Sequence, residues 1–203
     1  MKTLFIDTSS FFVNIAITNG DKILTKIQKE IKSDMSSLIL PIIRDSFNSV
    51  DFELKDLDKI FVVNGPGSFT GIRVGVSIAK TIAWGFNIPI YPVSSLELLA
   101  TTNTEFDFCI PMIDARRGNV FGAIYNKNLD IVLNEQLISK EELLNNFNSN
   151  YLIVSNDFEE YTKPNLDFIK IIKKHEKDIP INPHNLNPRY LKLTEAEEKL
   201  KNV

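Results

Sequence analysis

Short apolar runs rich in β-branched residues alternate along the chain with longer stretches of helical periodicity. The first half has strand-like runs at residues 3–7, 11–18, 23–27, 60–63 and 88–93. Apolar residues at helical spacing predict one helix from about Asp34 to Phe47, which Pro41 is expected to bend, and another from Gly71 to Phe86. Ser94 and Glu97 have the spacing of a capping box for a third helix. We therefore expect three strands followed by an α-β-α-β-α series.

The second half has a similar order of elements. Strand-like runs occur at residues 108–114, 120–125, 129–138 and 151–154. Ser139 and Glu142 form the capping box of a helix between the last two runs. Prolines keep much of the last thirty residues extended until Thr194, which is expected to cap a short charged helix.

The two halves are related by a gap-free offset of 107 residues. Over the fourteen positions that start at Ile6, six identities appear, among them Ile6-Asp7 with Ile113-Asp114 and Ala16-Ile17 with Ala123-Ile124. Both copies read as strand, turn and strand, with an aspartate at the end of the first strand. We infer a duplication, and we expect two small lobes at residues 1–103 and 104–203.

A glycine-rich segment, residues 64–75, lies between an apolar strand and an apolar helix. This junction is where many proteins bind anions, because backbone N–H groups and the helix dipole point out of it. However, Gly71 is followed by Ile72 rather than the lysine of a Walker loop, and the step from Gly67 to Gly71 is one residue too long for a dinucleotide fingerprint. The alternative is that the glycines allow close packing, with Ser68 or Thr70 as the helix N-cap.

Composition narrows the class of protein. A chain of 203 residues with 43% apolar residues can bury a proper core, and its net charge of −3 does not fit a nucleic-acid binder that acts alone. No membrane span or signal peptide is expected, and the single cysteine, Cys109, fits the reducing cytoplasm. His175 and His184 lack the spacing of a metal site, so we predict none.

Two lobes that each begin with a hairpin and an aspartate resemble the plan of actin, hexokinase and Hsp70 ATPases. In those proteins, glycines in the hairpin turns let backbone amides contact phosphate. Here the first turn has Thr8 and Ser9 after Asp7 but no glycine, and the second turn delays its glycine to Gly118. Asp7, Thr8, Ser9 and Asp114 therefore predict a degenerate nucleotide site, with Asp7 as a water-mediated Mg²⁺ ligand or simply as the cap of its turn.

Five stretches together resemble the TsaB (YeaZ) family of bacterial proteins for tRNA threonylcarbamoyladenosine (t6A) biosynthesis. The stretches are Ile6-Asp7-Thr8-Ser9, the loop signature Gly65-Pro66-Gly67-Ser68-Phe69-Thr70-Gly71-Ile72-Arg73, Pro92-Val93-Ser94-Ser95-Leu96-Glu97, Ile113-Asp114-Ala115-Arg116-Arg117-Gly118 and Pro188-Arg189-Tyr190-Leu191. One departure is Met35, where many members have histidine. The resemblance covers nearly the whole chain. It implies an α/β fold of the duplicated actin/Hsp70/hexokinase (ribonuclease H-like) class, with a mixed sheet and helices in each lobe.

The resemblance also implies a function. Members of this family are non-catalytic partners of TsaD, the paralogue that transfers a threonylcarbamoyl group to N6 of adenosine 37 in tRNAs reading ANN codons. The ATPase TsaE binds the assembled pair, tRNA is reached only through the complex, and the isolated subunit forms a homodimer. No cofactor is required, and weak ATP, ADP or Mg²⁺ binding at a shared interface stays open. The rival interpretation is an active ATPase or a glycoprotease-type metallopeptidase.

In the family, both dimers use the two helices of the N-terminal lobe. Small or apolar positions away from each helix's core stripe would let a partner helix approach. On the two predicted helices, the interface candidates are Leu38, Ile39, Ile42, Gly71, Arg73, Gly75, Ser77, Ile78 and Ile82.

Overall fold

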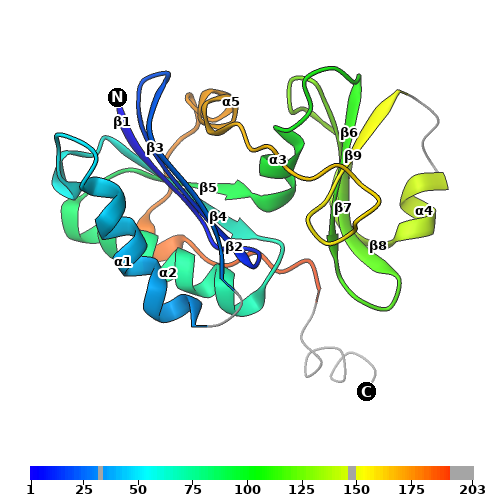
Figure 1. Ribbon diagram of the computed structural model, residues 1–203, viewed down its shortest axis with the longest axis horizontal. Coiled ribbons are helices and arrows are strands. Elements are labelled where there is room, and N and C mark those ends of the chain that lie inside the picture. Colours follow the sequence, from blue (N-terminus) through cyan, green and yellow to red (C-terminus); the bar gives the residue numbers. More distant parts are fainter. Residues whose placement is uncertain (32–33, 146–149, 193–203) are drawn as a thin grey trace.

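Two mixed β-sheets form the frame of the molecule, seen in a computed structural model that describes every residue except 32–33, 146–149 and 193–203 (Figure 1). The first sheet has the order β3-β2-β1-β4-β5, and its strands are β1 (Lys2–Asp7), β2 (Phe12–Asn19), β3 (Lys22–Glu30), β4 (Lys59–Gly65) and β5 (Ile90–Ser94). The second has the order β8-β7-β6-β9, with β6 (Phe108–Asp114), β7 (Asn119–Asn126), β8 (Ile131–Ser139) and β9 (Tyr151–Val154). In each sheet the first strand pairs antiparallel with the next one and parallel with a later one.

Helices cover both faces of these sheets and give the molecule a layered build. Helices α1 (Met35–Phe47) and α2 (Phe69–Phe86) lie on the outer face of the first sheet, and α4 (Lys140–Asn145) lies on the outer face of the second (Figure 1). Helices α3 (Ser95–Ala100) and α5 (Phe168–Lys174) lie between the sheets. Two short 3-10 turns, η1 (Leu54–Asp56) and η2 (Pro183–Asn185), complete the described elements.

Three apolar clusters fill the spaces between these layers. The outer faces of β1, β2 and β4 pack on α1 and α2, while the inner faces of both sheets share one cluster with α3 and α5. A smaller cluster lies under α4. Strands whose residues are buried on both faces read as continuous apolar runs, which is why the sequence located them.

Several elements differ from the expectation. Helix α2 begins two residues earlier than predicted, at Phe69, and its last residue, the apolar Phe86, is 48% exposed. Pro41 lies inside α1, which continues from Met35 to Phe47. The sequence pattern did not predict helix α5, because its apolar face is short and lies among lysines. That face consists of Phe168, Ile171 and Ile172. The helix expected at Thr194 lies outside the described residues.

The segment after α5 returns to the first sheet. Ile181 bridges to Ile90 of β5, and Leu186 is buried in the cluster beneath α2. The sheets fall on either side of residue 103, but this returning tail belongs spatially with the first sheet. The division into lobes at 1–103 and 104–203 therefore stays a proposal.

Candidate functional site

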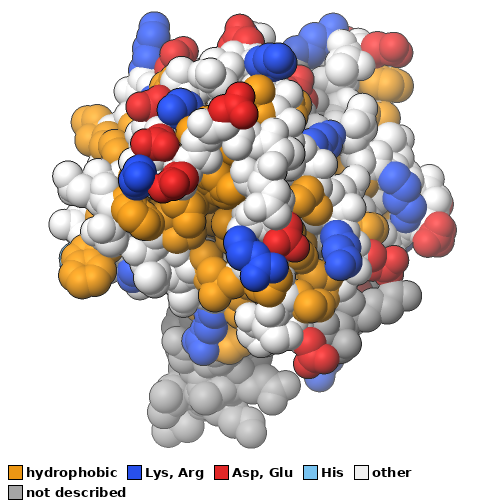
Figure 2. Space-filling model, turned by 60° about the vertical axis from the view of Figure 1, so that its left-hand side comes forward, with side chains coloured by type: hydrophobic (Ala, Val, Ile, Leu, Met, Phe, Trp, Pro, Cys, Tyr) orange, Lys and Arg blue, Asp and Glu red, His pale blue; other side chains and the backbone are white. Residues whose placement is uncertain are grey.

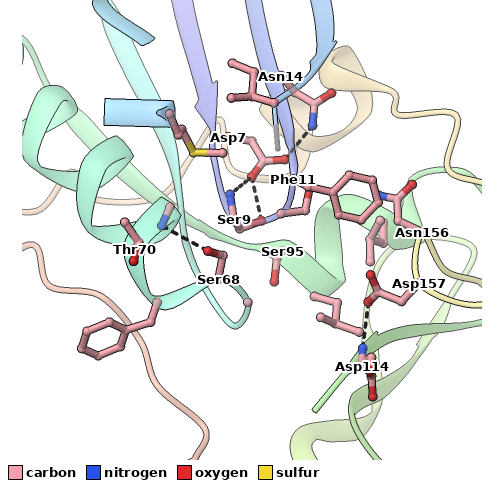
Figure 3. Close-up of a pocket in the computed structure, with 18 of the residues that line it drawn as sticks. Asp7, Ser9, Phe11, Asn14, Ser68, Thr70, Ser95, Asp114, Asn156 and Asp157 are labelled. Atoms are coloured by element: carbon pink, nitrogen blue, oxygen red, sulfur yellow. Dashed lines mark hydrogen bonds between the residues drawn. The ribbon is translucent and has the colours of Figure 1, made fainter. Parts of the chain in front are cut away.

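A cleft of about 610 Å³ opens between the lobes, beside the ends of β1 and β6 (Figure 3). Its polar and aromatic lining comes from both hairpins, the glycine loop, α3 and the loop after β9. These lining residues include Asp7, Ser9, Phe11, Asn14, Ser68, Thr70, Ser95, Asp114, Arg116, Asn156 and Asp157. The cleft brings together Asp7, Ser9 and Asp114 of the predicted nucleotide site.

Asp7 ends β1 with only 5% of its surface exposed. One carboxylate oxygen, Oδ1, accepts the Ser9 N–H at 2.8 Å and the Ser9 hydroxyl at 2.7 Å. The other accepts the Asn14 side-chain N–H at 2.9 Å. Burial raises the pKa of Asp7, and these hydrogen bonds oppose the rise. The carboxylate thus holds its own hairpin turn in shape.

The first hairpin turn is docked on the glycine loop. The Thr8 hydroxyl donates to the Gly71 carbonyl at 2.7 Å, and the Ser68 N–H donates to the Ser9 carbonyl at 2.7 Å. The hydroxyls of Thr8 and Ser9, expected to contact phosphate, therefore have partners within the chain.

Three glycines permit this contact. A Cβ at Gly67 would lie 2.2 Å from the Ser9 carbonyl oxygen, and a Cβ at Gly71 would lie 2.0 Å from the Thr8 carbonyl oxygen. At Gly75 it would lie 2.2 Å from the Thr8 hydroxyl oxygen. No side chain fits at such distances, so the sequence needs glycine wherever the loop and α2 meet the turn.

Other residues of the loop signature fix the start of α2 and the neighbouring helix. Ser68 is the N-cap, because its hydroxyl oxygen accepts the Gly71 N–H at 3.2 Å. The Pro66 carbonyl accepts the hydroxyl of Ser95 on α3. Thr70 is exposed in the first turn of α2 and lines the cleft.

The C-terminal tail covers the other side of the loop. Gly65 has φ +125°, and a Cβ there would lie 2.3 Å from the Arg189 carbonyl oxygen. The Arg189 N–H donates to the Asn64 carbonyl at 2.7 Å, while its guanidinium pairs with Glu135 of β8, whose side chain is 3% exposed. The tail thereby connects the first lobe to the second, a role that the sequence alone did not reveal.

The hairpins are not equivalent at the register that the 107-residue offset implies. Asp7 pairs with Asn14, so the offset would pair Asp114 with Phe121. The structure pairs Phe121 with Ile113 instead. The pairing registers of the two hairpins therefore differ by one residue, so the 107-residue offset can hold for one strand of the second hairpin but not for both.

Asp114 is exposed and belongs to a polar group on the second wall of the cleft. Its N–H donates to Asp157 at 2.8 Å, and its own carboxylate accepts the Arg116 N–H at 2.8 Å. Arg116 and Arg117 have φ of +68° and +56°, which is uncommon for residues other than glycine. Partial desolvation raises the pKa of Asp157, and the Asp114 carboxylate adds to the rise. No local motif singled out Asp157, because a loop brings it to the cleft.

The interface candidates on α1 and α2 are distributed over several faces. Ile39 is buried, and Gly71 and Gly75 are buried against the hairpin turn. Arg73 and Ser77 lie on the exposed side of α2 that faces the tail. The candidates at or near the α1–α2 surface are Leu38, Ile42, Ile78 and Ile82.

A groove of about 790 Å³ runs along the C-terminal half of α1 to η1. It is lined mainly by apolar side chains, including Leu40, Phe47, Phe52 and Ile82. Leu40 is 55% exposed and Leu38 is 37% exposed. Figure 2 turns this side of the molecule forward and shows apolar side chains gathered in its central area.

No three His, Cys, Asp or Glu side chains within residues 1–31, 34–145 and 150–192 are grouped so that they could hold a metal ion. Over the same part of the chain, no helix has both the length and the apolar character needed to cross a membrane.

Comparisons with known proteins agree on one group of relatives. The family model for TsaD, tRNA N6-adenosine threonylcarbamoyltransferase, matches residues 27–181. The chain is 35% identical to the tRNA threonylcarbamoyladenosine biosynthesis protein TsaB of Bacillus subtilis, over 98% of this chain and 97% of that protein. It is 30% identical to the protein of the same name from Escherichia coli, over 63% of this chain and 56% of that protein.

A solved structure supports the fold. YeaZ from Pseudomonas aeruginosa superposes with a TM-score of 0.79 at 19% identity, covering 94% of this chain and 99% of that one. Together with the two mixed sheets and their helices, this match confirms the duplicated actin-like fold class expected from the sequence.

Proposed function

Because this chain belongs to the TsaB family of t6A biosynthesis proteins, we propose that it is a non-catalytic subunit that pairs with a TsaD-type paralogue through α1 and α2. In this proposal the paralogue transfers the threonylcarbamoyl group to N6 of adenosine 37 in tRNAs reading ANN codons. TsaE binds the assembled pair, and the isolated subunit forms a homodimer through the same helices.

The observation that carries the proposal is the uncovered apolar surface of α1 and α2. Leu38 and Leu40 project from a helix whose other face is buried in the core, and the groove beside them is mainly apolar. Exposed apolar area of this kind on a soluble domain marks a protein contact. Gly85 adds to it, because none of the residues that the structure describes lies within 4 Å of a Cβ at this position, and a partner helix can approach closely.

The geometry of the cleft supports a non-catalytic role. The groups best placed for phosphate or proton transfer, namely Asp7, Thr8 and Ser9, bond to one another or to the glycine loop. A catalytic acid or base needs its reacting atom free to reach substrate. ATP, ADP or Mg²⁺ would then bind weakly, and only where a partner completes the site.

A charge introduced at Leu40 tests the interface. Leu40→Glu should abolish co-purification with the TsaD-type paralogue, because the carboxylate would lose water on docking. Leu40 is 55% exposed, so circular dichroism should stay native. The matched control is Val132→Glu, since Val132 is 48% exposed on β8, away from α1 and α2. Wild-type recovery of the complex with Leu40→Glu would refute the interface.

Reconstitution tests the role. Modification of tRNA should require this chain together with TsaD, TsaE and threonylcarbamoyl-adenylate, and this chain alone should form no product. Titration of the purified chain with Mg-ATP distinguishes the non-catalytic subunit from the rival interpretation, an active ATPase. Micromolar affinity with turnover would favour an active ATPase over a supporting subunit.

A further inference from the structure

Two segments of this chain contain no acidic residue at all. The first runs from Lys59 to Leu96 and includes α2, and the second runs from Ile179 to Thr194 and includes the tail as far as Lys192. The whole chain has 26 acidic residues among 203, so two such stretches mean that acidic residues are distributed unevenly along the sequence. In the structure, the tail runs beside α2 (Figure 1).

One side of α2 presents aromatic and basic side chains beside this tail, with the two cations between rings at either end. We call Phe69, Arg73, Lys80, Trp84 and Tyr190 the aromatic–basic strip. The four residues on α2 recur at steps of four, seven and four, which keeps them on one helical face. That face is separate from the one that points toward α1.

At the N-terminal end of the strip, the cation and the rings are stacked. The Phe69 and Tyr190 rings lie 5.1 Å apart at 26°, and the Arg73 guanidinium carbon lies 3.8 Å above the Phe69 ring. The Arg73 Nε donates to the Tyr190 hydroxyl at 2.8 Å. Yet Phe69 and Tyr190 remain 46% and 41% exposed. Arg73 and Tyr190, which are 117 residues apart in the sequence, therefore meet in a contact that is not part of the hydrophobic core.

At the C-terminal end, Trp84 is 67% exposed and makes an edge contact with His184 of the tail. Between the two ends, the Lys80 ammonium donates to the carbonyls of His184 and Leu186. Among residues 1–31, 34–145 and 150–192, no carboxylate forms an ion pair with Arg73 or Lys80.

We propose that the aromatic–basic strip binds a single-stranded RNA segment, with bases stacked on Phe69, Tyr190 and Trp84 and phosphates paired with Arg73 and Lys80. Stacking on aromatic rings and guanidinium planes, combined with unpaired cations, is how proteins hold unpaired nucleotides. From Phe69 to Trp84 the helix rises about 22 Å at 1.5 Å per residue, which accommodates several nucleotides. The two cations lie between rings at both ends of the strip, so positive charge stands beside stacking platforms, as in grooves that bind single strands.

This proposal rests on the proposed role in tRNA modification, and it places a tRNA contact on this subunit within the complex. The net charge of −3 agrees with a local contribution rather than independent tight binding. The strip lies on a different face of α2 from the surface assigned to the paralogue, so both can be engaged at once.

Trp84 is the single tryptophan of the chain, so its fluorescence reports directly on the strip. Titration of the full chain with an unstructured ten-nucleotide RNA at low salt should quench this emission. Arg73→Gln and Lys80→Gln should each weaken binding about fivefold to tenfold and lower the slope of log K against log salt by about 0.7. The matched control is Arg44→Gln, because Arg44 is an exposed arginine on α1.

The assembled complex provides the second readout. Phe69→Ala and Trp84→Ala should raise the Kd for tRNA several-fold, with Phe86→Ala as a control that also removes an exposed ring from α2. Absence of quenching, or equal loss with Arg44→Gln, would overturn the proposal. The proposal would also be overturned if the paralogue shielded Trp84 from solvent while Phe69→Ala and Trp84→Ala left tRNA affinity unchanged. The strip would then be a protein interface. Failure of Leu40→Glu to break the complex would instead count against the proposed function.

Discussion

The close contact between Thr8 and Gly75 predicts that substitution by alanine has opposite effects on protein stability at two glycines of helix α2. In Gly75→Ala, the new Cβ would lie 2.2 Å from the Thr8 hydroxyl oxygen, which is held by its bond to Gly71. Overpacking that cannot relax costs about 3 kcal/mol, and the helix propensity of alanine offsets about 1 kcal/mol. The net loss of about 2 kcal/mol lowers Tm by roughly 4–8 °C for a chain of this size.

Gly85→Ala is the matched control in the same helix, because no atom of the described residues lies within 4 Å of a Cβ at that position. It should stabilise the protein by about 0.5 kcal/mol, since it lies near the end of α2. Both values come from urea and thermal unfolding followed by circular dichroism.

A double-mutant cycle identifies the cause. Thr8→Ala alone should cost about 2 kcal/mol for the lost hydrogen bond and methyl group. Without the hydroxyl, the nearest atom to the new Cβ is the Cβ of residue 8 at 3.4 Å, an ordinary contact. The double variant should then be about 3 kcal/mol more stable than the sum of the single losses. Additive losses, or a Gly75→Ala protein as stable as the wild type, would refute the close-packing explanation of the loop.

Two further predictions concern the links between the lobes. Arg189→Met should destabilise the protein by about 2 kcal/mol in urea unfolding, because the buried side chain of Glu135, 3% exposed, loses its cationic partner. A loss below about 0.5 kcal/mol would show that the pair contributes little. The hydrogen bond that the His175 imidazole donates to the Glu97 carboxylate at 2.9 Å, supported by a second bond to Asp178, raises the pKa of His175 above its usual 6.5. The His175 interaction therefore stabilises the protein fully below pH 6.5, and this stabilisation is lost as pH rises through the higher pKa of the folded state. The stability difference between wild type and His175→Gln should therefore shrink toward pH 9. A difference independent of pH would contradict this assignment.

Local sequence patterns were sufficient for most of the regular elements. The strands from β1 to β9 are visible as apolar or alternating runs, because burial on a sheet imposes a short period on the sequence. Helix α5 was not visible, since its seven residues carry one apolar face too short to stand out among lysines. The 107-residue offset did not predict the pairing register of the second hairpin, which differs by one residue, because identities alone do not report which residues pair across a hairpin.

The candidate site was predictable only in part. Asp7, Ser9 and Asp114 do line the cleft, and the sequence could indicate them because each ends or follows a strand. Asp157 and Asn156 come from an irregular loop, and Arg189 and Tyr190 from an extended tail. Such residues leave no periodic signal, because their positions depend on contacts made far along the chain.

The sequence by itself determined the fold class, the family and the place where glycine is indispensable, because patterning and a long motif are local properties. Only the tertiary structure decided what those glycines contact. Gly67, Gly71 and Gly75 meet the first hairpin turn, and Gly65 meets the tail. The same folding placed the two acid-free segments side by side and made one face of α2 aromatic and basic. Contacts between residues more than fifty positions apart arise from packing, and no local pattern encodes them.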